Sequence, residues 1–173
     1  DPLVSLMQDQ VEGLRNQGIE CVGAIYGGMS PAARSDVQND LWKGATRFLF
    51  VSPERLQSAE FRESLHKAAV EFHFSYVVVD EAHCVSEWGH DFRPAYLNVA
   101  RNISQHCASP TGSTPTLIAL TGTASKQVLL DMMRELSVSE PEAVIEPKTF
   151  NRPELKFWIQ RAEENERLPL LST

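Results

Sequence analysis

Two adjacent carboxylates, Asp80 and Glu81, directly follow a short apolar run, and this arrangement could do chemistry on a phosphate. Carboxylates beside a buried strand cost free energy unless a cation or hydrogen bonds compensate them. An aspartate in this place can hold the water shell of Mg²⁺, and the next residue can then act as general base toward an attacking water. For an isolated Asp-Glu pair, a solvated strand end or a helix cap is the structural alternative.

The elements that must position this pair alternate between strand and helix patterns. Apolar and β-branched runs predict strands at residues 19–25, 47–51, 76–79, 116–120 and 155–160. Helical spacing of apolar residues predicts helices at 3–14, 31–41, 61–69, 96–106 and 129–136. Ser30 is expected as the N-cap of the second helix, with Pro31 in its first position.

This alternation predicts an α/β fold with a parallel β-sheet flanked by helices. The run at 76–79 is continuous and β-branched, which is typical of a strand covered on both faces. In parallel sheets, ligands bind beyond the carboxyl ends of the strands. The polar clusters at 52–55, 80–83 and 121–123 each follow a predicted strand, so we expect them to share one functional edge.

Composition limits the classes of protein that need consideration. The chain has 173 residues, a net charge of −7, 42% hydrophobic residues and 23% charged residues, which suits one globular domain and argues against disorder. No run approaches the ~18 apolar residues of a membrane helix, and no secretory signal is visible. The three cysteines have no CxxC spacing and favour a reducing compartment. The acidic balance argues against a wholly basic nucleic-acid coat but allows a local binding strip.

The residues around the carboxylate pair carry a resemblance to a known family. Residues 80–83 read Asp-Glu-Ala-His, the DEAH form of motif II of superfamily 2 helicases. The continuation at 84–94, Cys-Val-Ser-Glu-Trp-Gly-His-Asp-Phe-Arg-Pro, resembles the aromatic-rich loop of RecQ-type DNA helicases. Four further segments resemble this family. Residues 2–10 are similar to motif Ia, and residues 50–56 to a segment with a Ser-Pro-Glu-Arg core. Residues 119–124 are similar to motif III, and residues 150–153 to the junction with a second motor domain. Gly122 stands where RecQ motif III usually has alanine.

The resemblance implies a RecA-like fold of the P-loop NTPase type and an ATP-dependent DNA helicase. The implied cofactors are ATP and Mg²⁺, with Asp80 and Glu81 facing the nucleotide and Asp80 holding Mg²⁺ through water. Glu81 would be the general base. His83 would couple motif II to motif III by hydrogen bonding near Thr121 and Thr123.

The resemblance also implies a sensor of single-stranded DNA in the aromatic loop. Aromatic faces stack on bases for about 1–3 kcal/mol each, and arginine pairs with phosphates. The DNA-binding residues expected are Trp88, Phe92, Arg93, His90, Ser5, Gln8, Ser52 and Arg55, and the coupling residues are Thr121, Thr123 and Asp91. The structural alternative is that the aromatic side chains pin the loop onto the domain and the polar residues cap helices.

The sequence contains no GxxxxGK(S/T) phosphate loop, whose backbone and lysine bind phosphates in this family. We therefore expect an N-terminally truncated fragment. Residues 1–149 would be a partial first RecA-like domain, and 150–173 a linker and the start of the second domain or a C-terminal extension. Alone, the fragment is expected to hydrolyse ATP poorly or not at all.

The expected parent protein couples Mg-ATP hydrolysis to 3′-to-5′ translocation on single-stranded DNA and to unwinding of duplex DNA. Its second RecA-like domain would be a partner in the same chain, and no membrane contact is expected. The alternatives are another superfamily 2 motor, such as an RNA helicase, or a non-catalytic nucleic-acid-binding domain. The expected location is the cytoplasm or nucleoid of a bacterium, or the nucleus of a eukaryote.

Overall fold

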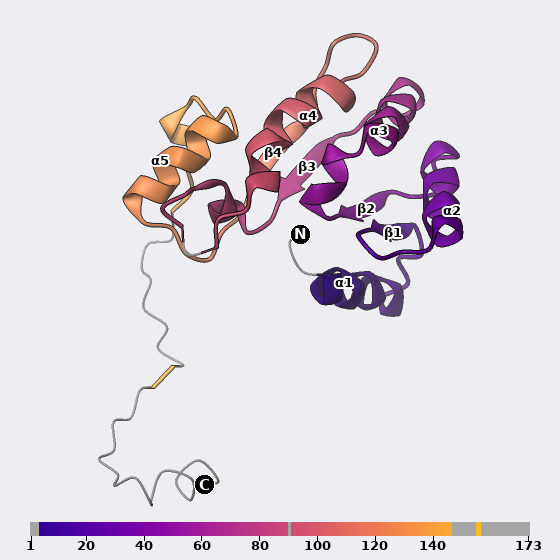
Figure 1. Cartoon of the computed structure of the whole chain (residues 1–173), viewed down its shortest axis with the longest axis horizontal. Coiled ribbons are helices and arrows are strands. Elements are labelled where there is room, and N and C mark those ends of the chain that lie inside the picture. The colour runs from indigo at the N-terminus through magenta and orange to yellow at the C-terminus, as the bar shows by residue number, and fades with distance from the viewer. Residues whose placement is uncertain (1–3, 90, 147–154, 157–173) are drawn as a thin grey trace, which may run out of the picture. The chain divides into compact units, whose positions relative to one another are not determined.

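The computed structural model describes residues 4–89, 91–146 and 155–156 (Figure 1). The chain divides into one compact unit, Asp1–Pro141, and a second, Glu142–Thr173, and the elements below belong to the first unless stated. The predicted junction at 150–153 and most of the predicted strand at 155–160 lie outside the described residues. None of the helices in the part of the chain that is described is long and apolar enough to span a bilayer.

The first half of the large unit follows the predicted alternation closely. Its elements are α1 (Val4–Asn16), β1 (Val22–Ile25), α2 (Pro31–Trp42), β2 (Phe48–Val51), the 3₁₀ turn η1 (Pro53–Gln57) and α3 (Ala59–Glu71). The predicted cap of α2 is confirmed, because the Ser30 Oγ accepts a hydrogen bond from the Ala33 N–H at 3.2 Å and Pro31 opens the helix. Gly18 ends α1 with a φ of 83°, a conformation that glycine adopts without strain.

The second half contains more short 3₁₀ turns than the sequence indicates. Its elements are β3 (Tyr76–Val79), η2 (Ala82–Val85), η3 (Pro94–Asn98), α4 (Val99–His106), β4 (Thr116–Ala119) and α5 (Lys126–Glu135), and η4 (Pro141–Ala143) spans the boundary of the two units. The helix predicted at 96–106 therefore begins as a 3₁₀ turn. Pro94 opens that turn and its ring fixes φ, while the α-helical hydrogen-bond pattern starts only at Val99.

The strands pair in parallel, as predicted. β1 pairs with β2 in the register Val22↔Phe48, and β3 pairs with β4 in the register Tyr76↔Thr116. Within the described residues these pairs form a two-stranded sheet each rather than one continuous sheet. Parallel pairing places the carboxyl ends of partner strands together, so the polar segments that follow β3 and β4 become neighbours.

One hydrophobic core holds both sheets. It runs from Ile25 of β1 through Phe61 of α3 to Val79 of β3 and Met132 of α5. Helix α3 packs against both α2 and α4, which lie on either side of it (Figure 1). Gly23 allows α2 to approach β1 closely, because a Cβ at this position would lie 2.9 Å from Val37 Cγ1.

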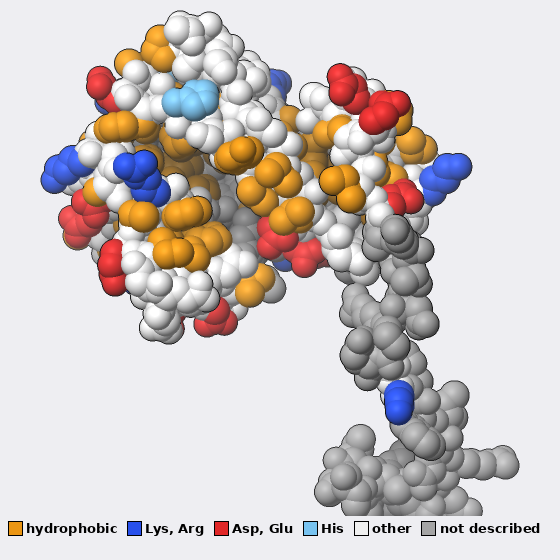
Figure 2. Space-filling model, turned by 180° about the vertical axis from the view of Figure 1, so that it is seen from behind, with side chains coloured by type: hydrophobic (Ala, Val, Ile, Leu, Met, Phe, Trp, Pro, Cys, Tyr) orange, Lys and Arg blue, Asp and Glu red, His pale blue; other side chains and the backbone are white. Residues whose placement is uncertain are grey.

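The prediction that the strand at 76–79 is covered on both faces is wrong. Val79 is buried, but Tyr76 and Val78 on the opposite face are 66% and 52% exposed. Ile118 on β4 and Leu120 directly after this strand are also exposed, so this face of the sheet is apolar and open in the described residues. Figure 2 shows hydrophobic side chains gathered on the side opposite the view of Figure 1. A β-branched run favours a strand for local steric reasons and does not by itself reveal how many faces are covered.

We predict that the cysteines differ sharply in reactivity. Cys84 and Cys107 are buried, and burial raises their pKa to about 11 and about 12, so neither forms the nucleophilic thiolate near neutral pH. Cys21 is only half-buried. At about pH 8, a thiol reagent should label Cys21 alone in the folded chain and every cysteine after denaturation. Cys21→Ser should abolish the fast labelling, and rapid labelling of Cys84 in the folded protein would contradict this core.

Candidate functional site

The end of β3 is a sharp left-handed turn at Glu81. This residue has φ 48° and ψ 43°, a conformation that costs a non-glycine residue about 1–3 kcal/mol. Neighbouring groups hold the turn in place. The Ala82 N–H donates to the Leu120 carbonyl at 2.8 Å, and the Tyr96 hydroxyl donates to the Asp80 carbonyl at 3.2 Å. The strained turn is thus fixed both from the residue after β4 and from η3, which points to a position with a function rather than to a loose strand end.

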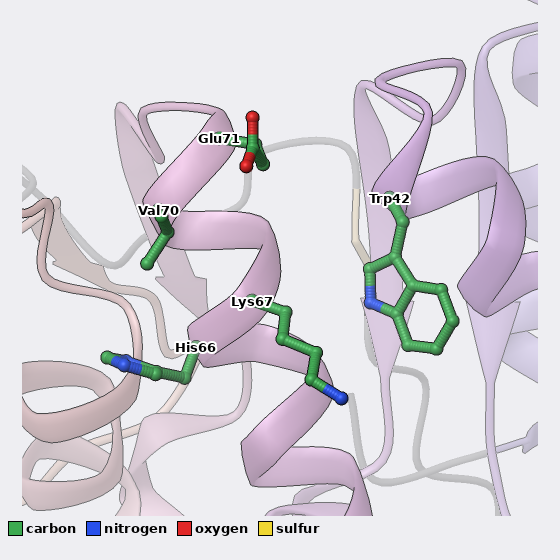
Figure 3. A pocket seen from close by; sticks show the side chains of 5 residues that line it. All are labelled: Trp42, His66, Lys67, Val70 and Glu71. Carbon is green, nitrogen blue, oxygen red and sulfur yellow. The ribbon is translucent and has the colours of Figure 1, made fainter.

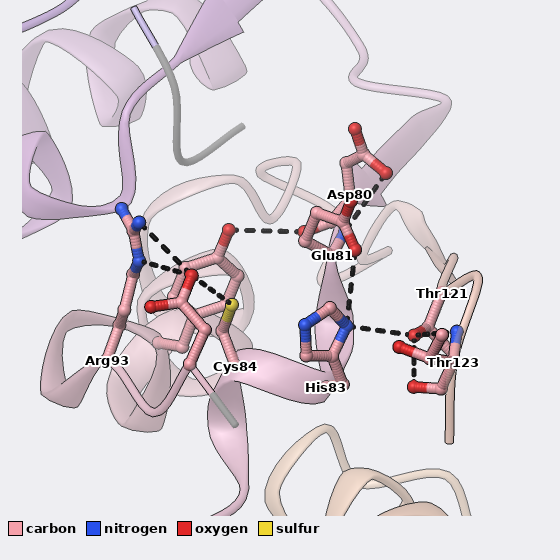
Figure 4. Close-up of polar contacts among 9 residues, drawn as sticks. Asp80, Glu81, His83, Cys84, Arg93, Thr121 and Thr123 are labelled. Carbon is pink, nitrogen blue, oxygen red and sulfur yellow. Dashed lines mark hydrogen bonds and ion pairs between the residues drawn. The ribbon is translucent and has the colours of Figure 1, made fainter. Parts of the chain in front are cut away.

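The predicted carboxylate pair is half-buried at the carboxyl end of β3. Asp80 Oδ1 accepts the Glu81 N–H at 2.9 Å, and the carboxylates project from the turn (Figure 4). These hard oxygen donors fit Mg²⁺, which is bound through one or two carboxylates and keeps several waters. The described residues contain no cluster of three or more His, Cys, Asp or Glu side chains that could hold a metal ion.

His83 joins the turn to the segment after β4. The buried imidazole places Nδ1 3.2 Å from Glu81 Oε2 and 2.9 Å from Thr121 Oγ1 (Figure 4). The Thr121 hydroxyl donates its proton to the Thr123 carbonyl at 3.0 Å and therefore accepts from the imidazole. Because a carboxylate also only accepts, both contacts require the proton on Nδ1. The hydrogen bond expected between motifs II and III is present, and the coupling role of His83 stays a prediction.

The residues from Cys84 to Arg93, here the 84–93 loop, form a loop closed at its base. The Arg93 N–H donates to the Cys84 carbonyl at 2.9 Å. Asp91 Oδ2 accepts from Arg93 Nε at 3.3 Å, from Arg93 Nη2 at 3.2 Å and from Cys84 Sγ at 3.9 Å. Burial, and then the charge of Asp91, raises the pKa of the Cys84 thiol to about 11. The thiol is therefore a structural hydrogen donor, and the loop ends are held together.

The exposed part of this loop carries Trp88. Its side chain is 77% exposed, whereas Phe92 is half-buried and the Arg93 side chain is 28% exposed beside Asp91. An indole pinned onto the domain would be buried, so this geometry favours the sensor interpretation over the structural alternative for Trp88. His90 lies outside the described residues.

The predicted strand-binding residues of the first half lie near the ends of β1 and β2. Gln8 of α1 donates from Nε2 to the Tyr26 hydroxyl at 2.8 Å, which ties this helix to the turn after β1. Ser5 is exposed on the same helix. Ser52 is buried, and its N–H donates to the Ile25 carbonyl at 3.2 Å. It therefore joins the ends of β1 and β2 more than it offers a hydroxyl to solvent.

Arg34 belongs to this group and was missed by sequence reasoning. The Nε atoms of Arg34 and Arg55 are buried and have no hydrogen-bond partner in the described chain, although Arg34 Nη2 donates to the Met29 carbonyl at 3.3 Å. Burial and then the charge of Arg34 lower the pKa of Arg55, with Glu60 acting in the opposite direction. The available signal was the parallel pairing of β1 with β2, which brings the turns after them together.

A shallow depression of about 240 Å³ lies apart from these clusters, between α2 and α3 (Figure 3). It is lined by Trp42, His66, Lys67, Val70 and Glu71, and the Lys67 Nζ sits 5.8 Å from the centroid of the Trp42 ring. None of the residues predicted for chemistry or binding lines it. The candidate site is therefore the strand-end edge and the 84–93 loop.

Comparison with known proteins points in the same direction. The family model described as "DEAD/DEAH box helicase" matches residues 1–131. The "ATP-dependent DNA helicase RecQ" of Pasteurella multocida is 35% identical over 158 residues, which covers 91% of this chain and 23% of that protein. The "ATP-dependent DNA helicase Q5" of Mus musculus is 37% identical over 164 residues, covering 94% of this chain and 16% of that protein.

A solved structure supports the fold. The Hef helicase domain of Pyrococcus furiosus has a TM-score of 0.53 and 19% identity, and the match covers 81% of this chain and 26% of that one. The α/β, RecA-like fold class expected from the sequence is thus confirmed. The chain spans only 23% and 16% of the length of the two curated relatives named above.

We predict that Gly89 is required for the closed loop. A Cβ at this position would lie 2.9 Å from the His83 carbonyl oxygen and 3.1 Å from the Ser86 carbonyl oxygen, and backbone atoms cannot turn aside. Gly89→Ala should therefore destabilise the folded chain by about 1–3 kcal/mol in denaturant titrations. Gly122→Ala is the matched control, because nothing lies within 4 Å of its Cβ, and it should change stability by less than about 0.5 kcal/mol. Equal stabilities of the two variants would contradict this loop geometry.

Proposed function

Because the chain belongs to the DEAD/DEAH box helicase family, as a RecQ-type segment of it, we propose that it provides the hydrolytic and DNA-sensing edge of an ATP-dependent DNA helicase. The observation that carries the proposal is the short polar path from the carboxylates to the exposed indole. Glu81 contacts His83, and the next residue, Cys84, is the base of the loop that presents Trp88. The residues proposed for ATP hydrolysis and those proposed for contact with the DNA strand are therefore adjacent in one local structure.

The carboxylate pair serves the nucleotide side. Asp80 would hold Mg²⁺ through its water shell, and the bound ion would neutralise the charge that develops on the phosphates. Glu81 takes the proton of the attacking water as general base. The imidazole Nδ1–H of His83 holds one Glu81 oxygen at 3.2 Å, which orients the carboxylate without neutralising it. The left-handed turn keeps this orientation through backbone geometry.

The 84–93 loop serves the DNA side. An exposed indole can stack on bases for about 1–3 kcal/mol each, without sequence preference. Phe92 and Arg93 follow in the sequence and are half-buried. Arg93 forms an ion pair with Asp91 and can exchange this carboxylate for a phosphate. His90 lies between Trp88 and Phe92 in sequence and outside the described residues, and a DNA contact of its side chain is proposed from the sequence alone. We propose 3′-to-5′ translocation on single-stranded DNA as the use of this contact, with a second RecA-like domain closing over the nucleotide.

The ends of β1 and β2 serve the phosphate backbone of the strand. Arg34 and Arg55 repel one another, and each has a buried Nε–H without a partner in the described chain. A phosphate oxygen would satisfy these donors and offset the repulsion. Ser5 and Gln8 extend this contact along α1. Ser52 supports it by joining the ends of β1 and β2 through its backbone hydrogen bond to Ile25. Such contacts position a strand and do not read its sequence.

Thr121 and Thr123 join the two sides. The Thr121 hydroxyl contacts both the His83 imidazole and the Thr123 backbone, so a displacement of His83 reaches the segment after β4 directly. Asp91 braces the other end of the same path through Cys84 and Arg93. We propose that strand binding at the loop and water activation at Glu81 influence one another through these contacts.

The proposal predicts separate losses from the two ends of the path. The test uses a chimera in which this chain replaces the matching segment of the Pasteurella multocida RecQ protein. Glu81→Gln should abolish ATP hydrolysis while single-stranded DNA still binds. Trp88→Ala should raise the DNA concentration needed for half-maximal stimulation of hydrolysis by about fivefold or more, because one base stack is lost. Steady-state hydrolysis against oligonucleotide concentration measures both effects.

The control for the indole is Trp88→Phe, which keeps an aromatic face and should retain most of the stimulation. Undiminished stimulation in Trp88→Ala would reject the sensor role. Stronger competition by RNA than by single-stranded DNA would favour an RNA-directed motor instead.

The two arginines predict a change in salt dependence. Neutralising one phosphate of a single strand contributes about −0.7 to the slope of log affinity against log salt concentration. Arg34→Ala and Arg55→Ala should therefore each make the slope for an oligo-dT strand less steep by about 0.7. Fluorescence anisotropy of the labelled strand, titrated at several salt concentrations, measures this slope. Lys67→Ala removes an exposed cation outside the site and should leave it unchanged, whereas equal slopes in all variants would exclude a phosphate contact.

A further inference from the structure

A buried polar bond joins the 84–93 loop to α5. The Ser86 hydroxyl donates to Asp131 Oδ2 at 2.7 Å, across 45 residues of sequence. Ser86 is 1% exposed and Asp131 is 5% exposed, so this is one of the few buried polar pairs in the described chain. Neither residue takes part in the function proposed above.

The same serine is joined to the sensing residue. The Trp88 N–H donates to Ser86 Oγ at 3.2 Å, so one hydroxyl connects the backbone of Trp88 to the carboxylate on α5. The other oxygen of that carboxylate, Asp131 Oδ1, lies 3.3 Å from Nη2 of the exposed Arg134. Each oxygen of the carboxylate therefore has a partner, and the two contacts hold the group in one orientation.

Helix α5 begins directly after the segment at 121–123. Ser125 caps it by accepting the Val128 N–H at 3.3 Å, and Val128 and Met132 pack into the core. Residues of α5 and η2 pack against each other. The helix is thus a short rigid element with Thr123 near one end and Asp131 facing the loop.

Packing alone does not require a charged residue at this position. A buried carboxylate carries a desolvation penalty, and an apolar pair of similar volume can pack as well or better. What a hydrogen-bonded pair adds is a fixed relative position, because the bond is made in one geometry only. The Ser86–Asp131 bond therefore specifies where the loop sits on the helix.

We propose that Asp131 is a positioning residue that ties α5 to the 84–93 loop through Ser86, so that the segment at 121–123 and Trp88 move as one body. This link does not pass through His83 and supplies a second connection between the same two regions. The inference rests on the proposed function for the use of that motion, but the link itself can be tested without nucleic acid.

The experiment compares Asp131→Ala with Asp131→Asn in the whole chain. The asparagine amide oxygen can still accept from Ser86, whereas alanine removes the acceptor and leaves a buried hydroxyl unpaired. Hydrogen–deuterium exchange should become about tenfold faster at residues 84–93 in Asp131→Ala and in Ser86→Ala. It should stay near the unaltered value in Asp131→Asn and in Arg134→Gln, which loses the ion pairs of the exposed Arg134 with Asp131 and Glu135 and keeps the Ser86–Asp131 bond. The rescue by asparagine separates positioning from a general loss of packing.

A second arm adds an oligo-dT strand. In the unaltered chain, binding should slow exchange both at 84–93 and at 121–125. In Asp131→Ala the strand should bind within about threefold of the unaltered affinity, while the protection at 121–125 falls by at least half. Unchanged loop exchange in Asp131→Ala, or an Asp131→Asn variant as fast as Asp131→Ala, would overturn the inference.

The two proposals fail in distinguishable ways. Should Asp131→Ala lose its cooperative unfolding transition, Asp131→Leu decides the ligand-free arm, because it removes the acceptor on α5, fills the vacated volume and keeps the Trp88 N–H bond to Ser86 Oγ. Failure of the unaltered chain to bind the strand would count against the proposed function, and the ligand-free exchange would still support or reject the link.

Discussion

The left-handed turn at Glu81 is the constraint on which the rest of the site depends. It ends β3 abruptly, so the chain neither continues along the sheet nor turns outward as an open loop. The strain of about 1–3 kcal/mol is offset by hydrogen bonds from Ala82 to Leu120 and from Tyr96 to Asp80. As a result the carboxylate of Glu81 stays near the surface while the next residues enter the core as η2. One backbone conformation therefore places the Glu81 carboxylate and anchors the first residues of the 84–93 loop.

The loop combines a rigid base with an exposed end, and this combination suits a sensor. Its base is held by the Cys84–Arg93 backbone bond, by Asp91 and by Ser86, whereas Trp88 at the exposed end makes only a backbone bond to Ser86 in the described chain. Binding at such an end can be transmitted only if the base moves as a unit. The His83–Thr121 bond connects that base to the segment at 121–123. The Ser86–Asp131 bond connects it to the middle of α5.

The sequence predicted those features that follow from local rules. The cap at Ser30, the strands at β1 to β4 and the carboxylates after β3 each depend on neighbouring residues, so pattern and propensity were sufficient. The open face of β3 was not predictable, because covering a strand depends on distant helices and not on its own side chains. Arg34 and Asp131 were missed for the same reason. Arg34 matters because its charge acts on Arg55, and Asp131 matters because it accepts a hydrogen bond from Ser86, and both partners are distant in sequence.

The proposed function requires an acidic chain to hold a polyanion, and the charge distribution is compatible with this. The net charge of −7 opposes an approaching strand at long range, but at physiological salt charges act over only about 8 Å. Within that range the turns after β1 and β2 bring Arg34 and Arg55 together, while the end of β3 presents the carboxylates of Asp80 and Glu81. The same strand-end geometry thus offers an anion site beside one sheet and a cation site beside the other. Under the proposed function, a DNA strand and a magnesium nucleotide need opposite charges to be held, and the two sheets would offer these charges at separate places.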